Sequence, residues 1–204
     1  MRNEARHTHR FSYADYLAFE GDTRWELIDG EAHAMAAAPT TRHQRIVQNL
    51  AGLLFNYFRG QPCRPFIAPT DVKLSDFDVV QPDGLVVCDR AKIGEAAIVG
   101  APDLVIEVLS PTTEAHDRRE KRALYERFGV PEYWIVSQSG FVEVYALDEQ
   151  GRYPAPTLAG LDESFTSPRF PEFGVNVQDL FEDVPIERPV LLTPPGGNGS
   201  PTPS

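Results

Sequence analysis

One acidic residue stands in the most apolar stretch of the chain. Residues 104–109 read LVIEVL, so Glu107 has branched apolar side chains on both sides. Such a run is typical of a strand that is covered on both faces. A carboxylate buried there is costly unless it is paired or bound to a metal. The stretch therefore predicts either a metal-binding acid or a buried ion pair at Glu107.

Three other charged residues could meet Glu107. Asp83 lies in VVQPDGLVV at 79–87, near the start of an otherwise apolar segment. Lys121 falls on a predicted helix, one turn before its apolar positions, and so at or beside the buried side of that helix. Glu31 is the first residue after a turn signal and would project from the strand that follows. We therefore treat these four residues as one candidate constellation.

Acids from neighbouring strands, together with a lysine, are the groups that phosphodiester hydrolysis needs. Carboxylate oxygens suit Mg²⁺ or Mn²⁺, which keep several waters and share their remaining positions with a phosphate. Such an ion lowers the pKa of a bound water and stabilises the leaving oxygen. A nearby ammonium would position the water and offset charge on the phosphate. The candidate metal ligands are Asp83, Glu107 and Glu31, and the candidate cation is Lys121.

Each of these residues also has a purely structural interpretation. Glu107 and Lys121 could form a buried ion pair, and Asp83 could simply begin a strand after a proline. Lys121 could instead bridge to Asp117 one helical turn earlier. Glu31 could be an exposed hairpin residue. The functional interpretation rests on the joint pattern, because independent accidents rarely align three such groups on interior faces.

Three further polar residues are candidates for supporting roles. His43 lies on the apolar side of a predicted helix, where a hydrogen-bonded core histidine is the alternative to a catalytic one. Gln81 precedes Asp83 by two residues, and Tyr125 lies on the inward side of the helix that carries Lys121. We expect Gln81 and Tyr125 to pack against the acids or to orient them.

The sequence pattern places these residues in an α/β fold, with one mixed central sheet flanked by helices and an N-terminal hairpin. Asp29-Gly30 supplies the turn of that hairpin. Pro82 predicts a bulge or an entry point in its strand. The segment 151–170 is predicted to be rich in loops. Helices are predicted over 12–20, 42–59 and 114–128, with a closing turn at 176–180, and strands over 64–74, 79–88, 104–109, 133–136 and 141–147.

Length and composition predict a single domain in a reducing compartment. The chain has 204 residues, 42% of them hydrophobic, which is enough for one full core. We assign the domain to residues 1–183 and a Pro/Gly/Ser-rich tail to 184–204, expected to be disordered from 193. Cys63 and Cys88 form no CxxC pattern, so a disulfide scaffold is not expected and the cytoplasm fits best. No secretion signal and no membrane span is predicted.

The net charge restricts the possible partners. A value of −11 argues against non-specific binding of nucleic acid, which usually needs a basic surface. Two interpretations remain. Either the acids gather at a cation site and leave a local basic strip at Arg118, Arg119, Lys121 and Arg122, or nucleic acid is not the substrate.

Several separated motifs resemble the Uma-type family, a large bacterial family of inferred endonucleases formerly classed as a domain of unknown function. The likeness runs from about Tyr13 to Leu180, in the family's order. That family is similar in turn to the restriction-endonuclease-like PD-(D/E)XK nucleases. The resemblance implies a four- or five-stranded mixed sheet flanked by helices, and metal-dependent cleavage of DNA. The motifs are WELIDGE at 25–31, the helix containing His43, QPD at 81–83, IEVLSP at 106–111 and EYWIV at 132–136.

The resemblance also implies roles for individual residues. Asp83 takes the place of the first motif acid and Glu107 that of the second. The standard motif has a lysine two residues after the second acid, where this chain has Leu109. Lys121 on the following helix would then supply the ammonium from another backbone position. Glu31 remains the candidate third acid, since residues 42–59 contain no carboxylate.

Three functional hypotheses follow from these residues. The leading one is a Mg²⁺- or Mn²⁺-dependent nuclease acting on DNA, for which a two-fold dimer would suit a duplex. The second is a nuclease-fold protein that no longer cleaves and serves as a binding or assembly module, favoured by Leu109 and the net charge. A glycosidase with paired carboxylates is weaker, because no aromatic platform accompanies the acids.

Overall fold

A six-stranded mixed sheet forms the centre of the molecule. The computed structural model of the chain describes residues 9–35 and 38–186. The central sheet has the order β11-β10-β9-β8-β6-β3, and only the β8–β9 pair is parallel within it. Its strands are β3 (Arg64–Ile67), β6 (Gly84–Val87), β8 (Leu104–Val108), β9 (Glu132–Ser137), β10 (Phe141–Ala146) and β11 (Thr157–Gly160).

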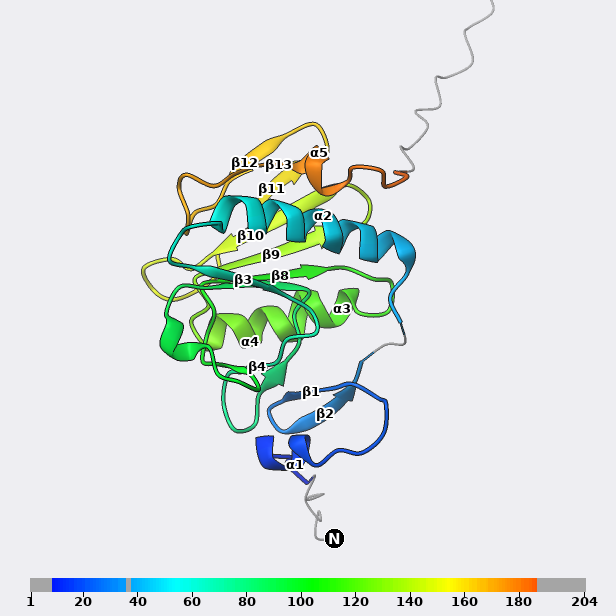
Figure 1. The fold of residues 1–204 in the computed structure, drawn as a ribbon, viewed down its shortest axis with the longest axis vertical. Helices are drawn as coiled ribbons and strands as arrows, with labels where there is room; N and C mark the ends of the chain where they lie inside the picture. Colours follow the sequence, from blue (N-terminus) through cyan, green and yellow to red (C-terminus); the bar gives the residue numbers. More distant parts are fainter. Residues whose placement is uncertain (1–8, 36–37, 187–204) are drawn as a thin grey trace, which may run out of the picture.

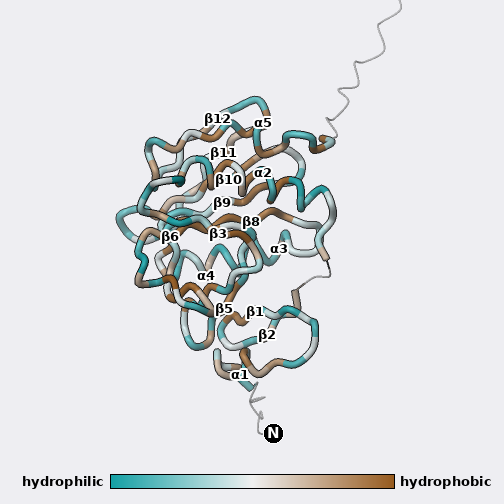
Figure 2. The backbone as a smooth tube through the Cα atoms, viewed as in Figure 1, coloured by the Kyte–Doolittle hydropathy of each residue, from teal (hydrophilic) through white to brown (hydrophobic). Residues whose placement is uncertain are grey.

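Helices cover both faces of this sheet. Helix α2 (Thr41–Phe58) lies across one face, and α3 (Glu114–His116), a π-helical turn (Asp117–Lys121) and α4 (Arg122–Arg127) lie across the other (Figure 1). Figure 2 shows apolar residues concentrated in the central strands and polar residues in the outer turns. The predicted α/β class with helix-flanked mixed strands is therefore confirmed.

Alternation along β8 decides which way its acid points. Leu104, Ile106 and Val108 belong to the apolar cluster that includes α2, and Val105 belongs to the cluster that includes α4. Successive side chains of a strand point to opposite faces. Glu107 therefore shares the face of Val105 and is directed toward the helical segment that carries Lys121.

A second sheet of five strands lies beyond the α3–α4 segment and includes the predicted hairpin. Its order is β2-β1-β5-β4-β7. Asp29 and Gly30 both have positive φ, 53° and 80°, as the predicted tight turn requires. Short helix α1 (Tyr13–Leu17) precedes the hairpin and begins at Ser12 with a capping box. The strands are β1 (Trp25–Ile28), β2 (Glu31–Ala34), β4 (Val72–Lys73), β5 (Val79–Val80) and β7 (Ile98–Val99).

The prediction of one sheet with continuous strands over 64–74 and 79–88 is wrong. Each segment is two strands in two different sheets, β3 with β4 and β5 with β6. Pro82 interrupts the second segment because proline lacks an N–H for the ladder. The chain therefore leaves the small sheet after Val80 and enters the central sheet at Gly84, which places Gln81-Pro82-Asp83 between the two sheets.

The closing part of the chain adds a small hairpin and a helix over α2. Strands β12 (Ser164–Thr166) and β13 (Gly174–Asn176) pair with each other, and α5 (Val177–Leu180) follows. Val184 is buried and Ile186 packs against the same core, so packing continues to the end of the described residues. The tail expected from residue 193 lies outside them.

A 3₁₀ turn, η1, covers Arg90–Lys92. In the parts of the chain that the structure describes, no helix is long and apolar enough to cross a membrane.

The two cysteines form a disulfide, contrary to the expectation from the sequence. Cys63 and Cys88 are bonded to each other. They immediately flank the paired residues Arg64 and Val87 of strands β3 and β6. The antiparallel register thus places the two cysteines opposite each other, a long-range relation that their spacing in the sequence does not reveal.

Candidate active site

Asp83 lies against the strand that carries Glu107. Gly84 pairs with Ile106 in the antiparallel register of β6 and β8, so the preceding residue, Asp83, falls opposite Glu107. The backbone N–H of Val108 donates a hydrogen bond to Asp83 Oδ2 at 2.8 Å. The predicted approach of these two acids therefore follows from strand pairing.

Glu107 is buried and hydrogen bonded through one of its oxygens. Its exposed fraction is 3%. Glu107 Oε1 accepts hydrogen bonds from Lys121 Nζ at 3.0 Å and from the hydroxyl of Tyr125 at 2.9 Å. Both donors come from the helical segment that covers this face of the sheet. The strand and the helix thus meet at a single carboxylate.

Lys121 lies among three carboxylates. Its Nζ is 2.9 Å from Glu26 Oε1, 3.0 Å from Glu107 Oε1 and 3.6 Å from Asp117 Oδ1. Asp117 and Lys121 begin and end the π-helical turn, and both are buried. Single π-helical turns inside helices occur frequently at functional sites. The sequence pattern predicted a continuous helix here and missed this turn, although it placed Lys121 correctly on the inward side.

Glu26 is the acid that sequence reasoning missed. It lies on β1, is 4% exposed, and accepts a hydrogen bond from the backbone N–H of Gln81 through Oε1 at 2.9 Å. The available signal was the one that identified Glu107, an acid within an apolar run, here Trp25–Ile28. Glu26 brings a fourth element, the N-terminal hairpin, to the site.

The structure does not bring Glu31 to this cluster. Glu31 is exposed at the turn end of the hairpin, opposite Ile28, and its side chain forms no ion pair or hydrogen bond with the described residues. Glu26 lies two residues further from the turn than Glu31 does, and its side chain is buried. The expectation that Glu31 supplies the third acid is therefore not met by the geometry.

His43, Gln81 and Tyr125 each contact the cluster. His43 Nε2 is 3.2 Å from Asp83 Oδ2, so His43 is neither a plain core residue nor remote from the acids. Its pKa is raised, because the hydrogen bond and charge of Asp83 outweigh the lowering effect of burial. Gln81 donates from its side chain to Tyr16 and to Asp71, at 3.1 and 2.7 Å, besides its backbone bond.

The electrostatics of the cluster fix the protonation of its lysine. Burial by itself lowers the pKa of Lys121, but the carboxylates of Glu107, Glu26 and Asp117 raise it well above its ordinary value. Lys121 is therefore an ammonium at neutral pH and donates hydrogen bonds. It can orient a water or stabilise an anion, but it does not take up a proton in this state.

The acids outnumber this cation. Burial raises the pKa of Glu107 well above its ordinary value, against the opposing effect of Lys121, and burial also raises the pKa of Asp117. Asp83 and Glu26 add to the same negative field. A second positive charge would stabilise the ionised form of these carboxylates, which is the electrostatic condition for a bound cation.

The oxygen donors at the centre of the cluster fit a hard divalent cation. The hydrogen bonds of Asp83 go to Oδ2 and those of Glu107 go to Oε1. Within the described residues, the second oxygen of each carboxylate has no hydrogen-bond partner and could serve as a ligand. Carboxylate oxygens are the donors that Mg²⁺ and Mn²⁺ prefer.

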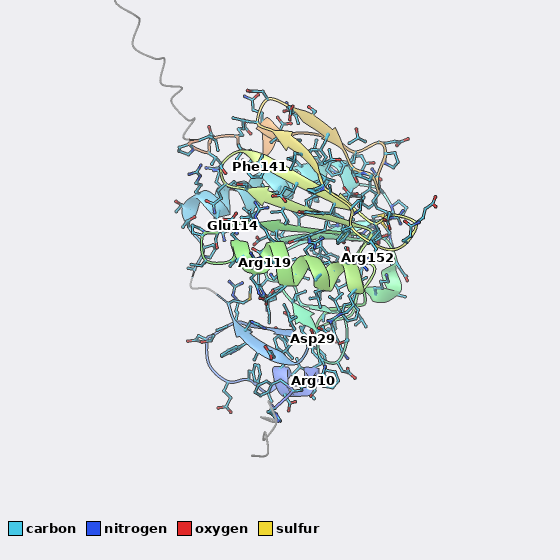
Figure 3. The ribbon with its side chains drawn as sticks, turned by 180° about the vertical axis from the view of Figure 1, so that it is seen from behind. Arg10, Asp29, Glu114, Arg119, Phe141 and Arg152 are labelled. Carbon is cyan, nitrogen blue, oxygen red and sulfur yellow. A yellow bond between two sulfur atoms is a disulfide. The ribbon has the colours of Figure 1, made fainter. Side chains whose placement is uncertain are left out.

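One of the two interpretations of the net charge placed a local basic strip along the helical segment, and the structure shows that strip only in part. Lys121 is buried, and Arg118 pairs with Glu114 at 2.9 Å and with Glu143. Arg119, labelled in Figure 3, remains exposed on this segment. Buried acids thus engage two of the four cations that this interpretation named.

Comparison with known proteins now places the chain. A family model described as "Uma2: Putative restriction endonuclease" matches residues 12–178, most of the chain. The chain belongs to the Uma2 family. The resemblance drawn from separated motifs is thereby confirmed. The matched range includes every residue of the cluster described above.

Two known proteins that resemble this Uma2 protein are informative. One is the "Uncharacterized protein slr1290" of Synechocystis, 31% identical over 140 residues, which cover 66% of this chain and 72% of that protein. The other is a crystal structure described as "a putative nuclease belonging to DUF820" from Anabaena variabilis. It superposes with a TM-score of 0.69 at 20% identity and covers 84% of this chain and 98% of that one. The second likeness shows a shared fold.

The different positions of Glu26 and Glu31 in this Uma2 protein lead to a first prediction. Glu26→Gln is expected to lower the free energy of unfolding by about 1–3 kcal/mol. Lys121 loses a charged partner, and the N–H groups of the new side-chain amide are buried beside other hydrogen-bond donors. Glu31→Gln, the matched control on the same hairpin, should change it by less than about 0.5 kcal/mol. Urea denaturation measures both. Equal effects of the two substitutions would contradict the inward placement of Glu26.

Proposed function

We propose that this Uma2 protein is a metal-dependent endonuclease that hydrolyses phosphodiester bonds in DNA. The observation that carries the proposal is the contact of the Lys121 ammonium with Glu107, on the strand beside Asp83. One acid on strand β8, a second acid directly before the neighbouring strand β6, and a cation in contact with Glu107 are the kinds of group that this hydrolysis needs. The family assignment supports a nuclease.

Asp83 and Glu107 would hold Mg²⁺ or Mn²⁺ through their second oxygens. The bound ion would lower the pKa of a coordinated water and stabilise the oxygen that leaves phosphorus. His43 would keep Asp83 oriented through its 3.2 Å contact, and Tyr125 would do the same for Glu107 through its 2.9 Å hydrogen bond. Both are positioning residues in this proposal.

Lys121 would act as a fixed positive charge. Its three carboxylate partners keep it protonated, so its N–H groups can orient the attacking water and stabilise negative charge on the phosphate. Leu109, at the position of the standard motif lysine, is buried in the apolar cluster with Leu124 and Tyr125. The helical segment therefore supplies the ammonium that the strand does not.

DNA cleavage in the presence of defined metals tests the proposal. Supercoiled plasmid is expected to become nicked or linear with Mg²⁺ or Mn²⁺ and to remain intact with EDTA. A single-stranded RNA, assayed in parallel under the same conditions, should be cleaved more slowly than the plasmid. Asp83→Asn, which keeps the side-chain shape, should slow cleavage at least about 100-fold because it removes a charged ligand.

The controls distinguish the competing functions. Circular dichroism and the urea midpoint should show that Asp83→Asn is folded, so that loss of activity reports on the site. Folded wild-type protein that cleaves neither DNA nor RNA with any divalent ion would favour the binding or assembly module. Cleavage that Asp83→Asn leaves unchanged would show that the site lies elsewhere.

A further inference from the structure

Two histidines and a glutamate gather beside the candidate active site without any role in it. His33 on β2, His116 at the end of α3 and Glu120 in the π-helical turn each offer one ligand atom, and these atoms all lie within 4.8 Å of one another. The rings of His33 and His116 are 5.1 Å apart between centroids. His116 Nδ1 is 2.8 Å from Glu120 Oε2. His33 is far from the other two in the sequence, whereas His116 and Glu120 lie four residues apart on adjoining helical turns.

A second observation shows an unused ligand atom at this cluster. His116 Nε2 is buried and has no hydrogen-bond partner among the residues that the structure describes. Its nearest carboxylate is Glu26, whose Oε2 lies 3.8 Å away, too far for a hydrogen bond. A buried polar atom without a partner is costly, and a bound ion is one way to satisfy it.

We propose that His33, His116 and Glu120 bind a transition-metal ion such as Zn²⁺. Two imidazoles and one carboxylate are the donors that zinc uses in proteins, whereas Mg²⁺ prefers oxygen ligands alone. Three side-chain ligands leave further coordination positions, which water or Glu26 Oε2 could take. The site is thus chemically distinct from the oxygen-only set formed by Asp83 and Glu107.

The position of the site gives it a structural consequence. His33 pairs with Glu26 across the hairpin, and Glu120 directly precedes Lys121. An ion bound by both His33 and Glu120 would therefore link the β1–β2 hairpin, which carries Glu26, to the π-helical turn, which carries Lys121. Glu26 Oε1 and Lys121 Nζ are themselves 2.9 Å apart. Zinc at this site would hold the hairpin against the helical segment. This role does not depend on the proposed nuclease activity.

Zinc binding to the full-length protein tests the inference directly. Protein stripped with EDTA and returned to buffer with excess Mg²⁺, which competes for the oxygen-only set, is titrated with ZnCl₂ in a calorimeter. One Zn²⁺ per chain is expected to bind, and the melting temperature should rise with zinc concentration. His33→Ala and Glu120→Gln should each weaken binding at least about 10-fold.

Two matched variants complete the design. His9→Ala removes an exposed histidine outside the cluster and should leave zinc affinity unchanged. Asp83→Asn should also leave it unchanged, since Asp83 is not a ligand of this site. Glu120 is exposed, so Glu120→Gln is not expected to impair folding. Zinc binding that is absent, that survives in both His33→Ala and Glu120→Gln, or that is lost only in Asp83→Asn would overturn the proposal.

Discussion

Lys121→Met is expected to destabilise the protein by about 3–5 kcal/mol and to slow metal-stimulated cleavage about 10²- to 10³-fold. Methionine retains most of the apolar side chain but leaves Glu26, Glu107 and Asp117 without their shared cation. The carboxylates are buried, so solvent cannot replace the lost charge. Urea denaturation measures the first effect. The cleavage rate, taken where the variant is still folded, measures the second.

A double variant separates charge balance from chemistry. Adding Glu26→Gln to Lys121→Met removes one of the repelling carboxylates, so part of the lost stability should return while cleavage stays low. Lys73→Met serves as a matched control, because Lys73 forms an ion pair with the exposed Asp76 and lies over the ring of Tyr13. Its loss should cost no more than about 1 kcal/mol. Cleavage restored in the double variant would mean that Lys121 serves only to balance charge.

Glu107→Gln is expected to abolish cleavage with a much smaller loss of stability. The substitution removes the charge that would bind the metal, so cleavage should fall by at least about 10²-fold. Burial already raises the pKa of Glu107, so the ionised form is costly and a neutral amide relieves that cost. Lys121 still retains Glu26 and Asp117 as partners. We therefore expect a change in unfolding free energy below about 2 kcal/mol.

Binding of Mn²⁺, followed by calorimetry, is the independent readout for this variant. Affinity should fall in Glu107→Gln and remain unchanged in Glu95→Gln, a substitution of an exposed glutamate away from the site. The contrast with Lys121→Met is diagnostic, since both variants should lose activity but only the lysine variant should be strongly destabilised. A Glu107→Gln protein that binds Mn²⁺ and cleaves DNA at the wild-type rate would refute the assignment.

The sequence by itself determined the features that depend on near neighbours. A continuous apolar run located β8 with Glu107, and helical periodicity placed Lys121 at or beside the inward side of its helix. The Asp29-Gly30 turn was likewise legible from a short segment. Asp83 was recognisable because a single acid opened an apolar run, and the sequence also grouped it with Glu107.

The tertiary structure alone decided which distant elements meet. Glu26, and not Glu31, reaches Lys121, because the packing of the hairpin against the helical segment selects which hairpin residues face inward. The Cys63–Cys88 disulfide depends on the β3–β6 register, and the two sheets depend on where the chain departs at Pro82. Such pairings are set by long-range packing, which local sequence patterns do not encode. The three-carboxylate environment of Lys121 is a product of that packing.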